Sequence, residues 1–221
     1  MKKYVLILVV SAASFSQSVM AQEITLKAGA LGSDWRGNGI NVLNTLVGVT
    51  GKFLSRSPYI GYYGGATVSI PVSEQVSIEP GLIYSQSGTS LKGELGLKGI
   101  DFLNINASAS MVQQRIEMPV LLKADLGNGL QLMAGPQASY QLASKLRVQA
   151  GAFGFNLLNR SIDMSNSFEP LNVSAIAGLQ YNLPNGLGIQ ASYEHGLTSI
   201  MKDRSAKVYT QSGRVGLSYR F

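Results

Sequence analysis

Apolar and polar residues alternate with a period of two through eight separate stretches of this chain. In one of them Ile116, Met118 and Val120 share one face, while Arg115 and Glu117 lie on the other. Successive side chains of a β-strand point to opposite faces, so each stretch predicts a strand with one apolar and one polar face. Most stretches have about the ten residues that a tilted strand needs to cross a bilayer. They cover residues 24–30, 60–70, 76–84, 116–126, 130–142, 171–183, 187–193 and 209–221.

The connections between these strands come in two lengths that alternate along the chain. Three are tight turns, at residues 73–75, 127–129 and 184–186, and the last two contain Asn-Gly, the strongest short hairpin signal. The other four are longer, at residues 35–58, 90–110, 143–167 and 200–207. Outer-membrane barrels alternate in this way, with short periplasmic turns and longer external loops. The predicted fold is therefore all-β, an eight-stranded antiparallel up-and-down transmembrane β-barrel.

Composition decides which face of the barrel meets its surroundings. Only 14% of the 221 residues are charged and 45% are hydrophobic. Beyond residue 21, however, no stretch is long and apolar enough to span a bilayer as a helix. A soluble, lipocalin-like barrel would bury the apolar faces, and a membrane barrel would turn them to lipid. The polar faces are rich in Gly, Ser and Gln and carry few charges, which favours a narrow barrel interior over a surface in water.

The first residues have the pattern of an export signal. Lys2 and Lys3 precede an apolar run from Tyr4 to Ala13, and the small residue Ala21 stands where a signal peptidase would cut. We therefore expect a signal peptide over residues 1–21, cleaved near Ala21, and a barrel domain over residues 22–221. No cysteine follows the cut, which excludes a lipid-anchored lipoprotein. The expected location is the outer membrane of a Gram-negative bacterium.

Residue counts exclude several kinds of site. The chain has no cysteine, which rules out disulfides, thiolate metal ligands and cysteine nucleophiles. Its single histidine, His195, rules out a multi-histidine metal site. The net charge of +6 includes Lys2 and Lys3, and the other basic residues are scattered singly, so nucleic-acid binding has little support. We expect neither a metal nor a cofactor.

Charged residues occur on the polar faces of four predicted strands. Inside a narrow barrel they would lose hydration unless they were paired, so we expect salt bridges that fill the lumen. A gated polar path is the functional alternative. The expected lumen network comprises Glu79, Arg115, Glu117, Lys123, Glu194 and Arg214.

Tyrosines near the strand ends predict an aromatic girdle at the membrane interfaces. The expected girdle comprises Tyr59, Tyr62, Tyr84, Tyr140, Tyr181, Tyr193 and Tyr219. The chain ends in Phe221 on an amphipathic strand, which is similar to the signal read by the barrel-assembly machinery. Phe221 is therefore the expected assembly signal, and that machinery an expected partner during biogenesis.

Five short motifs follow one another at about the spacing of hairpins. They are EPGLIYS at residues 79–85, IEMPVLLK at 116–123, MAGP at 133–136, YEHGLT at 193–198 and GLSYRF at 216–221. Together they resemble the outer-membrane β-barrel domain family (porin-family, PorT-like proteins) of Gram-negative bacteria, over essentially the whole mature chain. The resemblance implies an eight-stranded outer-membrane barrel. PorT-like members are associated with a secretion apparatus, but no residue here singles out that role.

Taken together, these features predict a non-enzymatic envelope protein of structural or interaction type, accessory to export or adhesion. It would contact outer-membrane lipid, and envelope partners through its external loops. A narrow passive porin for small solutes is the alternative. No catalytic residue is expected, because Glu194 and His195 are neighbours on a strand and point to opposite faces, with His195 outward near the external rim. The apolar segment Ile40–Phe53 is expected to be a packed loop or strand extension, with a short helix or a partner-contacting segment as the alternatives.

Overall fold

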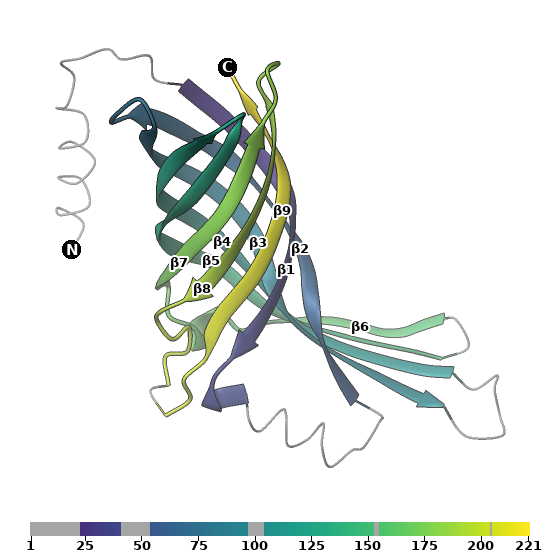
Figure 1. Cartoon of the computed structure of the whole chain (residues 1–221). Helices are drawn as coiled ribbons and strands as arrows, with labels where there is room; N and C mark the ends of the chain where they lie inside the picture. The colour runs from purple at the N-terminus through teal and green to yellow at the C-terminus, as the bar shows by residue number, and fades with distance from the viewer. Residues whose placement is uncertain (1–22, 41–53, 97–103, 153–154, 204) are drawn as a thin grey trace.

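Nine antiparallel strands form a single sheet in the part of the chain that the computed structural model describes, and eight of them close into a ring (Figure 1). The described residues are 23–40, 54–96, 104–152, 155–203 and 205–221. The ring order is β1, β2, β3, β4, β5, β7, β8 and β9, and β9 pairs back with β1. This confirms the predicted up-and-down barrel of eight strands.

The strand bounds follow the hairpins of the sequence. They are β1 Glu23–Arg36, β2 Leu54–Pro71, β3 Val76–Gly96, β4 Asn104–Gly127, β5 Leu130–Ala152, β6 Phe155–Asp163, β7 Leu171–Asn182, β8 Leu187–Gly196 and β9 Tyr209–Arg220. Two short 3-10 helices, η1 (Asn38–Ile40) and η3 (Ser165–Ser167), lie in the connections. Among the described residues, no helix is long and apolar enough to cross a membrane.

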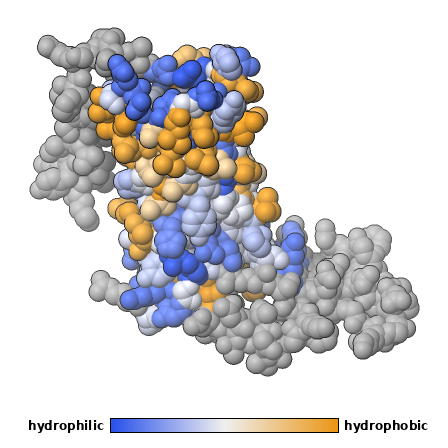
Figure 2. Space-filling model, in the orientation of Figure 1, coloured by the Kyte–Doolittle hydropathy of each residue, from blue (hydrophilic) through white to orange (hydrophobic). Residues whose placement is uncertain are grey.

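Apolar side chains cover the outside of the barrel, and polar side chains fill its inside. In β4, Met118, Val120 and Leu122 are 40–54% exposed, whereas Glu117 and Lys123 on the other face are at most 4% exposed. Figure 2 shows an orange band of hydrophobic residues across the visible face of the barrel, with bluer residues above and below it. A soluble barrel has the opposite arrangement, so the outside of this barrel faces lipid.

The tight turns lie together at one end of the barrel, where β1 begins and β9 ends. Between β4 and β5, Asn128 and Gly129 have φ values of 54° and 82°. Positive φ at both central residues is what a two-residue type I′ hairpin requires. The external connections are longer, as predicted, so the turn end is the periplasmic end.

Three strands continue well beyond the ring. β3, β4 and β5 have 21, 24 and 23 residues, and with β6 they form a sheet that projects sideways from the external end (Figure 1). Residues 54–58 of β2 pair with residues 89–93 of β3 along the edge of this sheet. We call residues 54–58, 87–96, 104–113, 143–152 and 155–163 the external sheet.

The external sheet corrects the prediction of loops at residues 90–110 and 143–167, which are strand over most of their length. Leu91 pairs with Ala109, and Val148 with Arg160. Neighbouring strands can form backbone hydrogen bonds with each other outside the bilayer as well as inside it. Outside the bilayer, however, a strand needs no regular apolar face. Period-two alternation therefore does not mark these extensions in the sequence. Two other predictions, the signal peptide over residues 1–21 and the segment from residue 41 to Phe53, lie outside the described residues.

Apolar residues from the external loops pack over the external end of the lumen. Trp35, at the end of β1, points inward and contacts Phe168, with ring centres 5.5 Å apart. The backbone N–H of Ile200 donates to the Val208 carbonyl at 2.8 Å, which joins the two sides of the β8–β9 connection just before β9 begins. We call these buried residues the cap cluster: Trp35, Ile40, Phe168, Ile200 and Val208.

Two inward-facing glycines make room for an aromatic ring inside the barrel. Gly29 of β1 and Gly216 of β9 are opposite each other in the ladder, and the ring of Tyr63 lies over both. The Tyr63 hydroxyl accepts a hydrogen bond from Gln190 Nε2 at 2.9 Å. A side chain at Gly216 would collide with the Tyr63 hydroxyl and with the carbonyl of Ala28, so only glycine fits at this position.

We predict that Gly216→Ala lowers the free energy of unfolding by about 1–3 kcal/mol, because the added methyl group must displace Tyr63 or the β1 backbone. Urea unfolding of the refolded protein in lipid vesicles measures this. Gly213→Ala is the matched control, because a Cβ at this outward position in the same strand meets no atom within 4 Å. Equal losses in the two variants would contradict the packing described.

Candidate functional site

Four charged side chains meet in the middle of the lumen and bridge it from side to side. Arg115 and Glu117 come from β4, Glu194 from β8 and Arg214 from β9. β4 and β9 are four positions apart in the ring of eight and therefore face each other across the lumen. All four residues are at most 5% exposed. We call them the central ion cluster.

The contacts in the central ion cluster are bidentate. Arg214 Nη1 and Nη2 donate to the two carboxylate oxygens of Glu117 at 2.7 and 3.1 Å. Arg115 Nη1 and Nη2 donate to the two oxygens of Glu194, both at 3.3 Å. Arg115 also lies 2.9 Å from Glu117 Oε1, and Arg214 contacts Glu194. Each guanidinium therefore contacts both carboxylates, and the four formal charges sum to zero.

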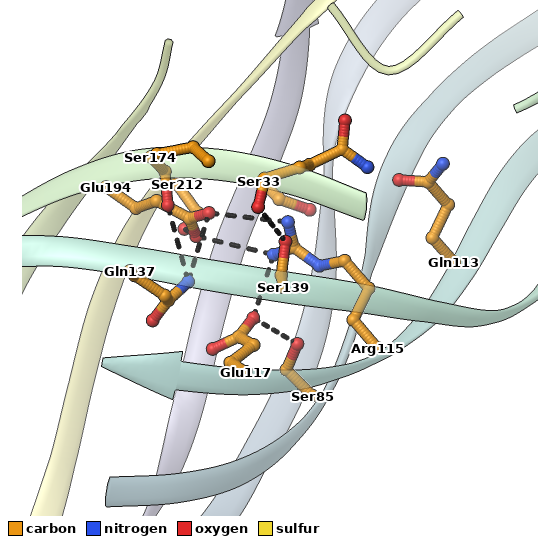
Figure 3. Close-up of polar contacts among 12 residues, drawn as sticks. Ser33, Ser85, Gln113, Arg115, Glu117, Gln137, Ser139, Ser174, Glu194 and Ser212 are labelled. Atoms are coloured by element: carbon orange, nitrogen blue, oxygen red, sulfur yellow. Dashed lines mark hydrogen bonds and ion pairs between the residues drawn. The ribbon is translucent and has the colours of Figure 1, made fainter. Parts of the chain in front are cut away.

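Neutral side chains supply further donors to the two carboxylates. Ser212 Oγ donates to Glu194 Oε2 at 2.9 Å, and Gln137 Nε2 donates to Glu194 Oε1 at 3.4 Å. Ser85 Oγ donates to Glu117 Oε1 at 2.5 Å. Figure 3 shows these serine, glutamine and carboxylate groups converging from several strands. A buried carboxylate is tolerated only when its oxygens are satisfied in this way.

A second cluster lies nearer the periplasmic end. Glu79 of β3 forms ion pairs with Lys27 of β1 and, at 2.6 Å, with Lys123 of β4. Lys123 Nζ also donates to Gln180 Oε1 at 2.9 Å. We call Lys27, Glu79 and Lys123 the periplasmic ion cluster. It carries one more positive than negative charge.

Apolar side chains lie beside and between the two clusters. Two buried groups point into the lumen: Leu31, Tyr63 and Ile83 in one, and Leu121, Met133 and Ile176 in the other. The space left among these residues and the neighbouring polar groups is a cavity of about 30 Å³. Such a volume holds about one or two water molecules, so the lumen at this level is filled by side chains.

The structure thus places all six charged residues named from the sequence inside the barrel, but in two clusters. Arg115, Glu117, Glu194 and Arg214 meet in one, and Glu79 and Lys123 belong to the other. Sequence reasoning missed Lys27. Lys27 stands between Leu26 and Ala28 in the weakest of the alternating stretches, and its side chain points to the other face of the strand. The same alternation therefore predicts that Lys27 faces the lumen.

The girdle tyrosines lie at two levels. Tyr62, Tyr84, Tyr140 and Tyr193 lie on the outside toward the external end, with the rings of Tyr62 and Tyr84 6.2 Å apart. Tyr59 lies at an irregularity in β2, and its hydroxyl accepts a hydrogen bond from Gln86.

Tyr181 and Tyr219 lie at the periplasmic end. There the ring of Phe221 packs edge-on against Tyr219 at 4.9 Å, and the Phe221 N–H donates to the Ile24 carbonyl at 3.0 Å. The final strand is thereby joined to the first, and Phe221 stays exposed on the barrel's outer face.

Glu194 and His195 are on opposite faces of β8. Glu194 is buried in the central ion cluster, whereas Arg36 Nη2 donates to His195 Nε2 at 2.5 Å on the outside. The two side chains therefore cannot act as an acid and base on one substrate. Within the described ranges, no group of three His, Asp or Glu side chains is arranged to hold a metal ion.

The chain matches one family of known proteins and is similar to several solved structures. A profile for the family described as "Outer membrane protein beta-barrel domain" matches residues 15–202. Comparison with curated proteins finds no match. The similar solved structures include Ail of Yersinia pestis in complex with a heparin analogue, at 16% identity over 91% of this chain and 100% of that chain, with a TM-score of 0.43.

Two further solved structures are similar. Neisserial surface protein A is 9% identical over 90% of this chain and 97% of that chain, with a TM-score of 0.41. OprG of Pseudomonas aeruginosa is 13% identical over 91% of this chain and 96% of that chain, with a TM-score of 0.36.

We predict that Glu194→Gln destabilises the barrel by about 3–5 kcal/mol, because it leaves two buried guanidinium groups short of a counter-charge. The measurement is urea unfolding in lipid vesicles. Glu23→Gln is the control: its pair with Arg220 spans 3.2 Å, but both side chains are more than 40% exposed, so we expect a loss below about 1 kcal/mol. A Glu194→Gln variant as stable as the control would contradict the role assigned to the cluster.

Proposed function

Because the chain belongs to the outer-membrane β-barrel domain family, we propose that it is a closed, non-enzymatic barrel that acts through its external sheet. The filled lumen is the observation that carries this proposal. From the periplasmic end outward, the lumen contains the periplasmic ion cluster, the central ion cluster and the cap cluster. Apolar side chains lie beside and between the two ion clusters and leave a cavity of about 30 Å³.

Each layer opposes the passage of solutes in a different way. A solute would have to separate the bidentate pair of Arg214 and Glu117, which leaves buried charges unpaired. It would also have to displace the apolar contact of Trp35 with Phe168. An eight-stranded barrel is only wide enough for its own side chains. These features support a static, space-filling lumen rather than a narrow porin.

The external sheet is the part that could meet a partner. Among the residues of this sheet whose exposure the structure describes, the exposed charges are mostly basic: Lys92, Lys145, Arg147 and Arg160, with Asp163. The side chains of Lys145 and Arg147 lie on the opposite face of β5 from those of Leu146 and Val148. A two-faced sheet beyond the membrane is suited to protein contact, which supports a role in adhesion or as an accessory to export.

The remaining expectations are part of the same proposal. A signal peptide ending near Ala21 would deliver the chain to the periplasm, and Phe221 would be read by the barrel-assembly machinery. No enzymatic step is proposed, because Glu117 and Glu194 are held by arginines and His195 lies on the lipid side.

We predict that the refolded protein gives no stable open channel in planar lipid bilayers, because the ion clusters and the cap cluster close the lumen. Heat-modifiable gel mobility of the same sample establishes that the barrel is folded and inserted. Long-lived conductance steps in most insertions of folded protein would overturn the closed-barrel proposal and favour the narrow porin.

We also predict that a photo-crosslinking residue in place of Ile162, exposed on β6, forms discrete adducts in intact cells. Val72, exposed at the periplasmic turn end, is the control position for contacts unrelated to the external sheet. The proposal fails if Ile162 gives no adduct, or only the adducts that Val72 gives.

A further inference from the structure

The charges buried inside the barrel do not cancel. Among the described residues, the buried charged side chains are four basic and three acidic ones: Lys27, Arg115, Lys123 and Arg214 against Glu79, Glu117 and Glu194. The central ion cluster is neutral, so the excess positive charge belongs to the periplasmic ion cluster, where Glu79 pairs with both lysines. A buried charge without a counter-charge is costly, so the lumen calls for one more negative charge.

The carboxylates at the periplasmic mouth of the barrel are poorly placed to supply this charge. Glu74 and Asp125 line an open pocket together with Lys123, but both carboxylates are exposed. Water and salt screen the charges of exposed groups, so these two carboxylates contribute little to a buried lysine. Lys27 contacts Glu79, but it shares that carboxylate with Lys123. The missing charge therefore has to be supplied from inside the lumen.

The cavity of about 30 Å³ in the lumen borders two cations and, among the described residues, no carboxylate. Lys27 of the periplasmic ion cluster and Arg214 of the central ion cluster both line it. Much of the remaining wall is apolar, from Ile83, Leu121 and Met133 among others. Electrostatic attraction is stronger in such a surrounding than in water, so the cavity favours a small anion.

Hydrogen-bond donors also meet at this cavity. Lysine and arginine side chains can only donate. The Tyr63 hydroxyl, which lines the cavity too, accepts a hydrogen bond from Gln190 Nε2 at 2.9 Å, so its own proton is left to donate elsewhere. Arg214 Cζ lies 5.7 Å from the centre of the Tyr63 ring. A hydroxyl proton and a guanidinium therefore border the same small space, and both suit an anion.

We propose that this cavity binds one monovalent halide ion, such as chloride, between Lys27 and Arg214. The ion brings the buried charge of the lumen to zero and links the periplasmic ion cluster to the central one. A volume of about 30 Å³ has room for one or two water-sized particles, hence for one halide ion but not for a polyatomic organic anion. The site stabilises the folded barrel and needs no external partner.

Bromide is the direct probe of this site, because its anomalous X-ray scattering distinguishes the ion from water. Crystals of the purified protein grown in sodium bromide should show an anomalous difference peak in the cavity between Lys27 and Arg214. A water molecule at that place, or bromide bound only at the protein surface, would overturn the proposal. This measurement needs no variant, so it does not depend on whether a substituted barrel folds.

Urea unfolding in lipid vesicles tests the same site without crystals. The unfolding midpoint should rise saturably as sodium chloride replaces sodium gluconate at constant ionic strength, because an ion that binds only the folded state stabilises it. Lys27→Met removes the excess charge and should abolish this dependence on chloride. Lys202→Met is the matched control, since it removes the same charge at an exposed position and should leave the dependence intact.

Tyr63→Phe provides a second variant, in case Lys27→Met does not fold. It removes only the hydroxyl group from the cavity wall, so it should weaken the dependence on chloride. A midpoint that is the same in chloride and gluconate would contradict the proposal. Full chloride dependence in Lys27→Met, or in Tyr63→Phe if Lys27→Met does not fold, would contradict it as well.

Discussion

Pairing of buried charge across the lumen is the interaction on which the rest of this structure depends. A chain that crosses lipid as strands must close into a ring, because no backbone group can be left unpaired there. Closure turns the apolar faces outward and leaves the polar faces to fill the interior. With eight strands that interior is narrow, and charges inside it are stable only in pairs such as Arg214 with Glu117. The same pairs join β4 to β9 across the ring, and they are the basis of the closed barrel that we propose.

If the lumen is closed, as we propose, any contact with a partner must be made on the outside of the barrel or beyond its external end. Above the membrane, β3, β4 and β5 continue into the external sheet, and β6 adds a further strand. At the external rim, Arg36 lies against Tyr209 and His195 on the lipid side. In the proposed role, the barrel is a rigid support that holds the external sheet at a fixed position. Glu117 and Glu194 contribute to this role only through stability, because they lie inside the barrel.

Local periodicity predicted the ring well, and long-range contacts explain where it fell short. The alternation around Ile116 and Glu117 identified both faces of β4, and Asn128-Gly129 marked its hairpin. The external sheet was missed because its strands pair without an apolar face toward lipid. The division of the lumen charges into two clusters depends on which strands face each other across the ring. The contact of Trp35 with Phe168 joins residues more than a hundred positions apart, and no local pattern encodes it.

A double-mutant cycle on Glu117 and Arg214 tests the central claim most directly. Glu117→Gln, Arg214→Gln and the double variant would be compared with the unaltered protein by urea unfolding in lipid vesicles. Because the two side chains make a buried bidentate pair at 2.7 and 3.1 Å, we expect a coupling energy above about 1 kcal/mol. Additive losses, within about 0.5 kcal/mol, would show that the pair does not join the two sides of the barrel.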